Sequence, residues 1–327
     1  MATTTITNKP QQARSIALVG ATGHIGKPIL SALLAPALHK ITVLTRADSP
    51  GVFPASSPSL TVHRVPSYDD QSTLTPLLAS IDVLIVAVSF TAYAVQTPLF
   101  RAAAAAGVKY ILPCEFGGDP HARGFRAHLD VFTEKEPYRA LIEELGVSSW
   151  IGVCTGPWFD FTMGIGGFGI DVKGKTALML GSSGGEGAEG PGGFGMQKAS
   201  VTTYKRVGEM VAQLLSLPED KLAEHRNQWV YLTSWAVSQR ELLESAMRVA
   251  GADREAWSVT EITVEQLLAT AREKMSRQET FMEGRLSLLL LVFGEGLGGD
   301  FGGKVLDAKD FGLDEEDLDE VMREVIG

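Results

Sequence analysis

Short apolar runs alternate with amphipathic stretches through the first half of the chain. Runs rich in Val, Ile and Leu occupy residues 15–19, 40–46, 60–64, 83–88, 110–112 and 149–153, and helical spacing occurs at 72–78, 98–106 and 129–145. Continuous apolar strands separated by helices are typical of a parallel sheet covered on both faces. The pattern therefore predicts an α/β fold with a doubly wound parallel sheet over residues 1–156.

The pattern changes after residue 156. Residues 170–180 predict a hairpin with its turn at 173–175, and residues 181–195 form a glycine-rich stretch that we expect to be a flexible surface loop. Helical spacing dominates further on, at 204–215, 238–249, 264–274 and 314–325. We therefore expect residues 157–327 to form a smaller, mostly helical substrate-binding region.

A glycine-rich turn joins the first strand to the first helix. Its spacing is G-x-x-G-x-x-G, from Gly20 through Gly23 to Gly26. Glycines let the backbone approach a pyrophosphate, and the N-terminus of the next helix attracts its negative charge. An ordinary strand-to-helix turn is the alternative. The prediction is a Rossmann-type dinucleotide site whose contacts come from Gly20, Thr22, Gly23, His24, Ile25 and Gly26.

The second strand ends on Arg46, twenty residues after Gly26. An acidic residue there would accept bonds from the free 2′-hydroxyl of NAD, whereas an arginine fork suits a 2′-phosphate. We therefore expect NADP(H), the alternative being a solvated arginine with no ligand. Ser89 and Phe90 follow the fourth strand and are expected beside the nicotinamide ribose, although packing at the strand end would also explain them.

The composition restricts the classes of partner. The chain has 327 residues, 45% of them apolar, and a formal net charge of −10. This charge argues against binding to nucleic acid or to acidic membranes, and residues 286–293 are too short an apolar run to cross a bilayer. The N-terminus does not have the pattern of a signal peptide, so we expect a cytoplasmic protein. Cys114 and Cys154 are expected to be buried thiols.

Ordinary short-chain dehydrogenases transfer the proton with a Tyr-x-x-x-Lys pair. This chain lacks the pair, because no tyrosine is followed four residues later by a lysine; Tyr138, for example, is followed at that spacing by Ile142. Lys135 is the candidate replacement. Pro137 is tolerated in a first helical turn, which predicts Lys135 near a helix start. Partial burial there would lower its pKa, unless Glu134 and Glu136 point the same way. A surface lysine without a function is the alternative.

Aromatic residues gather where two strands of the predicted sheet end. Phe116, Trp158, Phe159 and Phe161 could form an apolar wall against an aromatic substrate, and core packing is the alternative. Asp160 is the carboxylate among them and is expected to orient polar groups of the substrate. No His, Cys or carboxylate cluster has the spacing of a metal site, so no metal is expected.

Several of these segments together resemble the isoflavone reductase-like and NmrA-like families of atypical short-chain reductases. The resemblance lies in residues 20–26, in Arg46, in residues 112–119 and in the stretch from Lys135 to Glu143. Family members carry P-S-E-F-G where this chain has Pro-Cys-Glu-Phe-Gly at 113–117, and a lysine seven residues before an Ile-Glu pair. Residues 155–161 and 230–239 resemble the fungal branch, whereas the glycine-rich loop departs from the family.

The resemblance implies an NADP(H)-dependent reductase of a small aromatic or secondary-metabolite substrate. It also implies that Lys135 is the general acid or base and contacts the nicotinamide ribose. Two alternatives stay open: a non-catalytic NADP(H)-sensing regulator, and an isomerase or rearrangement enzyme that uses the same pocket without net redox chemistry. A small molecule is the expected partner, and a homodimer is left open.

Overall fold

The structure is a computed structural model, and it describes residues 11–53, 57–128, 131–181 and 194–327. Within these residues the largest sheet has seven parallel strands in the order β10-β6-β5-β4-β1-β2-β3. The strands are β1 (Ser15–Val19), β2 (Lys40–Arg46), β3 (Leu60–Val65), β4 (Val83–Val86), β5 (Tyr110–Leu112), β6 (Ser149–Cys154) and β10 (Gln228–Tyr231). The predicted parallel α/β sheet is confirmed.

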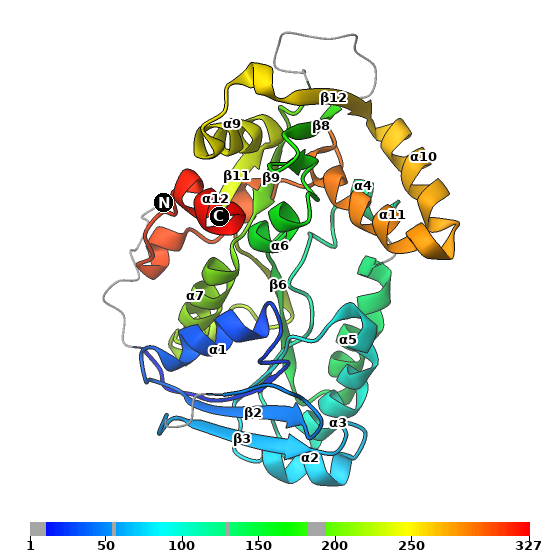
Figure 1. Cartoon of the computed structure of the whole chain (residues 1–327). Helices are drawn as coiled ribbons and strands as arrows, with labels where there is room; N and C mark the ends of the chain where they lie inside the picture. The colour runs from blue at the N-terminus through cyan, green and yellow to red at the C-terminus, as the bar shows by residue number, and fades with distance from the viewer. Residues whose placement is uncertain (1–10, 54–56, 129–130, 182–193) are drawn as a thin grey trace.

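Helices cover both faces of this sheet. One face holds α1 (Gly26–Leu34) and α7 (Tyr204–Leu215), and the other holds α2 (Gln71–Leu78), α3 (Gln96–Ala106) and α5 (Val131–Leu145). Figure 1 shows α1 on one side of β2 and β3, and α2 and α3 on the other. Among the described residues of the first half, the structure also has the 3₁₀ helix η2 (Phe90–Val95) and the short α4 (Arg123–Arg126). The sheet is therefore doubly wound, as the apolar pattern predicted.

The sheet takes strand β10 and helix α7 from beyond residue 156. Residues 228–231 pair with β6, and α7 packs against α1. A Rossmann-type unit made of residues 1–156 alone is thus incomplete in this structure. The apolar pattern missed this because β10 is a short run of four residues that lies far along the chain from its partner strand.

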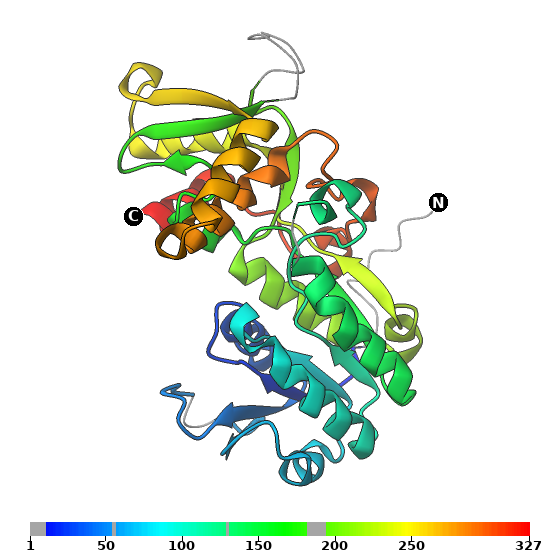
Figure 2. The same ribbon diagram turned by 90° about the vertical axis from the view of Figure 1, so that its right-hand side faces the viewer.

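A second group of elements lies beyond the carboxyl ends of the strands. Figure 2 shows it stacked above the sheet, in green, yellow and orange. Its strands are β7 (Ile170–Asp171), β8 (Thr176–Gly181), β9 (Lys198–Val201), β11 (Trp235–Ser238) and β12 (Ser258–Thr263). Its helices are α6 (Phe159–Gly164), α9 (Gln239–Ala250), α10 (Val264–Met275), α11 (Phe281–Ser287) and α12 (Leu318–Ile326). The short helix α8 (Glu219–Ala223) lies between α7 and β10. The 3₁₀ turns after β11 are η3 (Arg254–Ala256), η4 (Gln278–Thr280), η5 (Leu288–Phe293), η6 (Gly302–Lys304) and η7 (Ala308–Phe311).

This second group is mostly helical and has its own core around Phe159, Phe168, Trp257 and Phe293. The hairpin predicted at residues 170–180 is confirmed, since β7 and β8 pair antiparallel. Most of the glycine-rich stretch at 181–195 lies outside the described residues. The two cysteines are buried free thiols, as expected. Among the helices that the structure describes, none combines the length and the apolar character needed to cross a bilayer.

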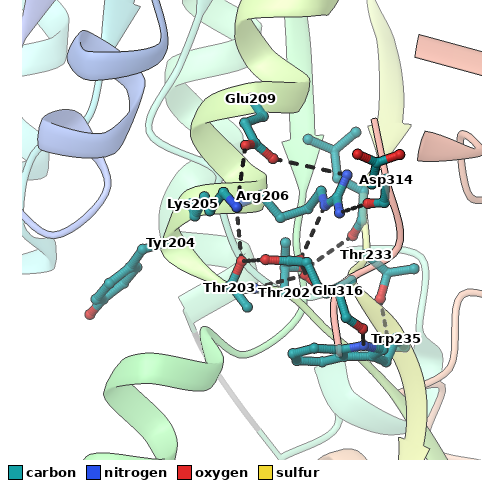
Figure 3. Close-up of polar contacts among 12 residues, drawn as sticks. Thr202, Thr203, Tyr204, Lys205, Arg206, Glu209, Thr233, Trp235, Asp314 and Glu316 are labelled. Carbon is teal, nitrogen blue, oxygen red and sulfur yellow. Dashed lines mark hydrogen bonds and ion pairs between the residues drawn. The ribbon is translucent and has the colours of Figure 1, made fainter. Parts of the chain in front are cut away.

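The C-terminal segment around Glu316 joins the large sheet and the second group of elements at the start of α7 (Figure 3). The Glu316 carboxylate accepts hydrogen bonds from Thr203 at 2.8 Å, from Arg206 at 3.1 Å and from the Ser234 hydroxyl. The Trp235 indole donates to the Glu316 carbonyl at 2.8 Å. Thr203 also caps α7, so one buried carboxylate holds this helix, β11 and the C-terminal segment together.

Candidate functional site

The glycine turn is shaped by two close backbone approaches. Gly20 has a φ of +85°, and a Cβ there would lie 2.2 Å from the Ala87 carbonyl oxygen, at the end of β4. A Cβ on Gly26 would lie 2.0 Å from the Gly20 carbonyl oxygen. Both positions therefore require glycine, because any larger side chain would push the turn away from the sheet or the helix.

The outer face of the turn fits a phosphate. Thr22, Gly23 and His24 are exposed, whereas Ile25 is buried and could contribute through its backbone alone. Helix α1 starts here without a side-chain cap and without an acidic residue in its first turn. Unpaired N–H groups at an uncapped helix start, together with the helix dipole, favour an anion. The residues present thus suit the pyrophosphate of a dinucleotide.

Arg46 is the last residue of β2 and its side chain is 60% exposed. Its guanidinium pairs with the exposed Asp48 carboxylate at 3.3 Å. The neighbouring loop is held by Arg64, which donates to the carbonyls of Ser49 and Gly51 at 2.9 Å each. Gly51 in turn packs against the Thr22 side chain of the glycine turn. The loop that carries Arg46 and Asp48 therefore borders the predicted dinucleotide site.

Ser89 and Phe90 follow β4, which neighbours β1 in the sheet. Both are exposed, and Ser89 caps η2 by accepting a hydrogen bond from the Thr91 N–H. The chain crosses from one half of the sheet to the other between β1 and β4, and ligands of such sheets bind at this crossing. These two residues and the glycine turn therefore lie at the same sheet edge.

Lys135 lies in the second turn of α5 and is only 8% exposed. Its ammonium donates to the Glu115 carbonyl oxygen at 2.5 Å and lies 3.7 Å from the Glu115 carboxylate. The same carboxylate forms an ion pair with Arg139, one turn further along α5. Two cations and one carboxylate thus leave a net positive charge in a buried group at the carboxyl end of β5.

The expected decrease in the pKa of Lys135 is wrong. Burial acts to lower this pKa, but the Glu115 carboxylate, with Tyr93 and Cys114, outweighs burial, and the pKa is raised. Spacing along the chain suggested Glu134 and Glu136 as the carboxylates near Lys135. The carboxylate that raises its pKa is instead that of Glu115, in the loop after β5. Lys135 is therefore a charged ammonium at neutral pH.

The helix that carries Lys135 begins at Val131, close to the predicted start at residue 129. Pro137 therefore lies inside the helix, and the expectation that it occupies the first turn is wrong. Lys135 is consequently held by the body of α5 and not by its N-terminus. The positive end of this helix dipole is therefore not what adjusts its pKa.

The predicted aromatic wall divides into two sets. Phe159 is fully buried between Phe168 and Trp235, and Phe116 is 3% exposed with a strained φ of +28°. Both are core side chains, which supports the alternative of core packing for these two residues. Trp158 and Phe161 are partly exposed and lie 6.3 Å apart between ring centroids.

Trp158 and Phe161 belong to a cluster that reaches the glycine turn. The His24 ring stacks on Tyr204 at 5.6 Å and lies 5.8 Å from Phe161. Tyr204 also contacts Trp158 at 5.9 Å. The cluster bridges the dinucleotide turn and the second group of elements, so these two aromatic residues keep their place as candidate substrate contacts.

Asp160 bonds to the protein's own backbone. Its carboxylate accepts a hydrogen bond from the Tyr204 N–H at 2.8 Å, at the start of α7, and burial raises its pKa. It lines a cavity of about 670 Å³ between α1 and α7, together with Pro28 and Ala32. A smaller cavity of about 340 Å³ lies beside Arg206 and Lys309. Lys135 lines neither of these two cavities.

Two partners of Lys135 could not be found from spacing. Glu115 pairs with its ammonium and also with Arg139, and the Tyr93 ring centroid lies 5.5 Å from the Lys135 nitrogen. Glu115 had a signal in the Pro-Cys-Glu-Phe-Gly segment, but Tyr93 lies 42 residues before Lys135 in the chain. Only the packing of η2 against α5 brings this tyrosine to the site.

Comparison with known families gives a match over most of the chain. A model described as the NmrA-like family matches residues 12–285. The chain is 27% identical over 268 residues to oxidoreductase aprR of Aspergillus flavus, covering 80% of this chain and 82% of that protein. It is 29% identical over 263 residues to oxidoreductase poxI of Penicillium oxalicum, covering 78% and 74%.

Solved structures share the fold. The chain is similar to isoflavone reductase with a TM-score of 0.71 and 18% identity, over 96% of this chain and 100% of that one. It is also similar to leucoanthocyanidin reductase from Vitis vinifera in its binary complex with NADPH, with a TM-score of 0.68, 19% identity and coverage of 95% and 99%. At such identities these structures establish the fold alone.

Proposed function

The chain belongs to the NmrA-like family and is an oxidoreductase, and we propose that it is an NADPH-dependent reductase of a small aromatic or secondary-metabolite substrate. Its fungal relatives named as oxidoreductases support the reaction class. A structurally similar reductase that binds NADPH, and the exposed Arg46 at the end of β2, support the cofactor.

The observation that best supports this proposal is a buried, positively charged group. It lies at the carboxyl edge of the sheet, and the glycine turn lies at the same edge. Lys135, Glu115 and Arg139 form this group next to the loop after β5. A preorganised positive charge in a water-poor place stabilises negative charge that develops on a reacting substrate. Such charge appears on oxygen when a carbonyl or an enone is reduced.

Three segments of the chain are assigned to contacts with the cofactor. The exposed part of the glycine turn would hold the pyrophosphate, Arg46 the 2′-phosphate, and Ser89 and Phe90 would border the nicotinamide ribose. NADPH, when bound, supplies a hydride from C4 of its nicotinamide. Lys135 is a protonated ammonium beside the proposed site, and this state suits the general acid of a reduction.

The test uses NADPH deuterated at C4 in each of its two stereoisomers. Wild-type protein and Lys135→Met are incubated with it and with a metabolite extract of the source cells, and products are identified by mass spectrometry. We expect deuterium from one stereoisomer in a product that the variant makes at least about 100-fold more slowly. Unchanged turnover by Lys135→Met would remove the catalytic role of Lys135.

Two other outcomes would replace the proposal. A new product without deuterium would assign the chain to redox-neutral chemistry in the same site. Tight NADPH binding without any product, from an extract that contains substrates of related reductases, would favour a cofactor-sensing regulator. A cytoplasmic location, a homodimer, an NADP-binding role for residues 1–156 and a substrate-binding role for residues 157–327 remain predictions.

A further inference from the structure

The contacts of Lys135 leave its ammonium little freedom to reach a substrate. Its side chain is 10% exposed, and its nitrogen faces the Glu115 carbonyl oxygen at 2.5 Å and the carboxylate at 3.7 Å. The Tyr93 ring centroid lies 5.5 Å from the same nitrogen. Because Lys135 is buried, a more exposed group beside its ammonium is suited to carry a proton from it to a substrate.

Tyr93 has the position that such a group requires. It lies on η2, which follows the exposed pair Ser89 and Phe90, and it is partly exposed where Lys135 is buried. The segment is fixed on both sides. Ser89 caps its start, and Gln96, just past its end, accepts a hydrogen bond from the Cys114 N–H at 2.8 Å, next to Glu115. The Tyr93 ring is thus held beside the Lys135 group.

We propose that Tyr93 is the catalytic residue that donates the proton to the substrate oxygen, and that Lys135 acts through it. The inference rests on the proposed reductase function and narrows its substrates to carbonyl compounds: aldehydes, ketones or enones. The tyrosine–lysine pair absent from any single helix of the sequence is assembled here from two elements, η2 and α5.

The step balances without a further reagent. As the hydride forms a C–H bond at the carbonyl carbon, or at the β-carbon of an enone, the π electrons move to oxygen. That oxygen takes the proton of the Tyr93 hydroxyl, and the Tyr93 phenolate takes a proton from the Lys135 ammonium. The resulting amine regains a proton from water. The positive charge left by Arg139 and Lys135 against Glu115 stabilises the transient phenolate.

A purely structural role for the Tyr93 hydroxyl is the competing explanation. Tyr138 provides the matched control, because its ring packs edge-on against Tyr93 at 6.4 Å and its hydroxyl can be removed in the same way. Tyr138→Phe should keep the activity of the wild type, whereas Tyr93→Phe should lose it.

The kinetic test uses purified full-length protein, NADPH and 4-nitrobenzaldehyde, or the substrate identified by deuterium transfer. We expect Tyr93→Phe to lower kcat by about 100-fold or more, with KM for NADPH changed less than about twofold. The double variant Tyr93→Phe/Lys135→Met should be no slower than the slower single variant, because the two groups act in series. Tyr93→Phe with more than half of the wild-type kcat, beside an impaired Lys135→Met, would overturn the proposal.

A second measurement needs neither cofactor nor turnover. Replacing Tyr93 by 3-chlorotyrosine, whose phenol is more acidic, allows its ionisation to be followed by absorbance in the folded protein. Lys135→Met should raise the midpoint of this titration by about one pH unit or more, because the nearby cation no longer favours the phenolate. An unchanged midpoint would overturn the pairing.

The two measurements separate the two proposals. If the wild-type protein transfers no hydride to any substrate, the reductase proposal fails, while the titration still decides whether Tyr93 and Lys135 are coupled. If hydride is transferred but Tyr93→Phe is as active as Tyr138→Phe, the reductase proposal holds and the role of Tyr93 is removed.

Discussion

At the scale of single residues, the charges at the end of β2 bear on cofactor choice. Arg46 and Asp48 face each other at 3.3 Å, with side chains 60% and 76% exposed. An exposed pair of this kind contributes little, and a doubly charged 2′-phosphate is a stronger partner for the guanidinium. Without the arginine, Asp48 would repel that phosphate. The proposed preference for NADPH therefore depends on Arg46.

Replacing Arg46 with alanine should weaken the binding of NADPH by about 10- to 100-fold and the binding of NADH by less than about twofold. Titration of the intrinsic fluorescence with each cofactor measures both constants. Arg101→Ala, which removes an exposed arginine on α3, is the control and should change neither. Equal losses of affinity for the two cofactors would mean that Arg46 does not bind the 2′-phosphate.

At the scale of elements, α7 depends on a segment more than one hundred residues further along the chain. Arg206, in its first turn, is 3% exposed and pairs with Glu316, whose side chain is 7% exposed. Removing one partner of a buried ion pair leaves the other charge without compensation. Because α7 packs on α1, the C-terminal segment supports the helix that starts at the dinucleotide turn.

We expect Glu316→Ala to lower the free energy of unfolding by about 3–5 kcal/mol, since Arg206, Thr203 and Ser234 all lose an acceptor. Urea unfolding followed by circular dichroism measures this change. The control is Glu315→Ala, which breaks an exposed pair with Lys309 and should cost less than about 1 kcal/mol. Similar losses of unfolding free energy in both variants would show that the buried contacts of Glu316 do not stabilise α7.

At the scale of the whole molecule, a buried polar group ties the start of the sheet to the end of α7. Arg14 is 4% exposed and donates to the carbonyls of Leu215 and Leu217. His39 accepts from the Arg14 N–H through Nδ1 at 3.2 Å and contacts the Ser216 hydroxyl through Nε2 at 3.1 Å. Burial, with the Arg14 charge, lowers the pKa of His39 to about 4.

This histidine should make the fold acid-sensitive. The unfolded chain binds its proton near pH 6.5 and the folded chain only near pH 4, so stability is complete above pH 6.5 and falls between these values. The full loss is about 3 kcal/mol. Urea unfolding at a series of pH values should show a smaller decrease over this range for His39→Gln than for the wild type. His63→Gln, on β3, is the control and should keep the wild-type slope.

Local patterns determined much of this protein. Apolar runs and their spacing were enough to predict the parallel sheet, its flanking helices and the 170–180 hairpin, because strand, turn and helix preferences act over a few neighbouring residues. The glycine turn was also visible, since Gly20 and Gly26 meet backbone atoms that any Rossmann-type crossing brings near. The family resemblance rested on the same short segments.

Tertiary structure decided the chemistry of the site and the extent of the sheet. Lys135 owes its raised pKa to Glu115 and Tyr93, Phe159 is closed off by Trp235, and β10 completes the sheet from beyond residue 156. Burial and charge act between groups that are near in space, whatever their separation along the chain. The sequence by itself therefore determined the fold class and the candidate residues, and the folded arrangement alone decided which of them share a site.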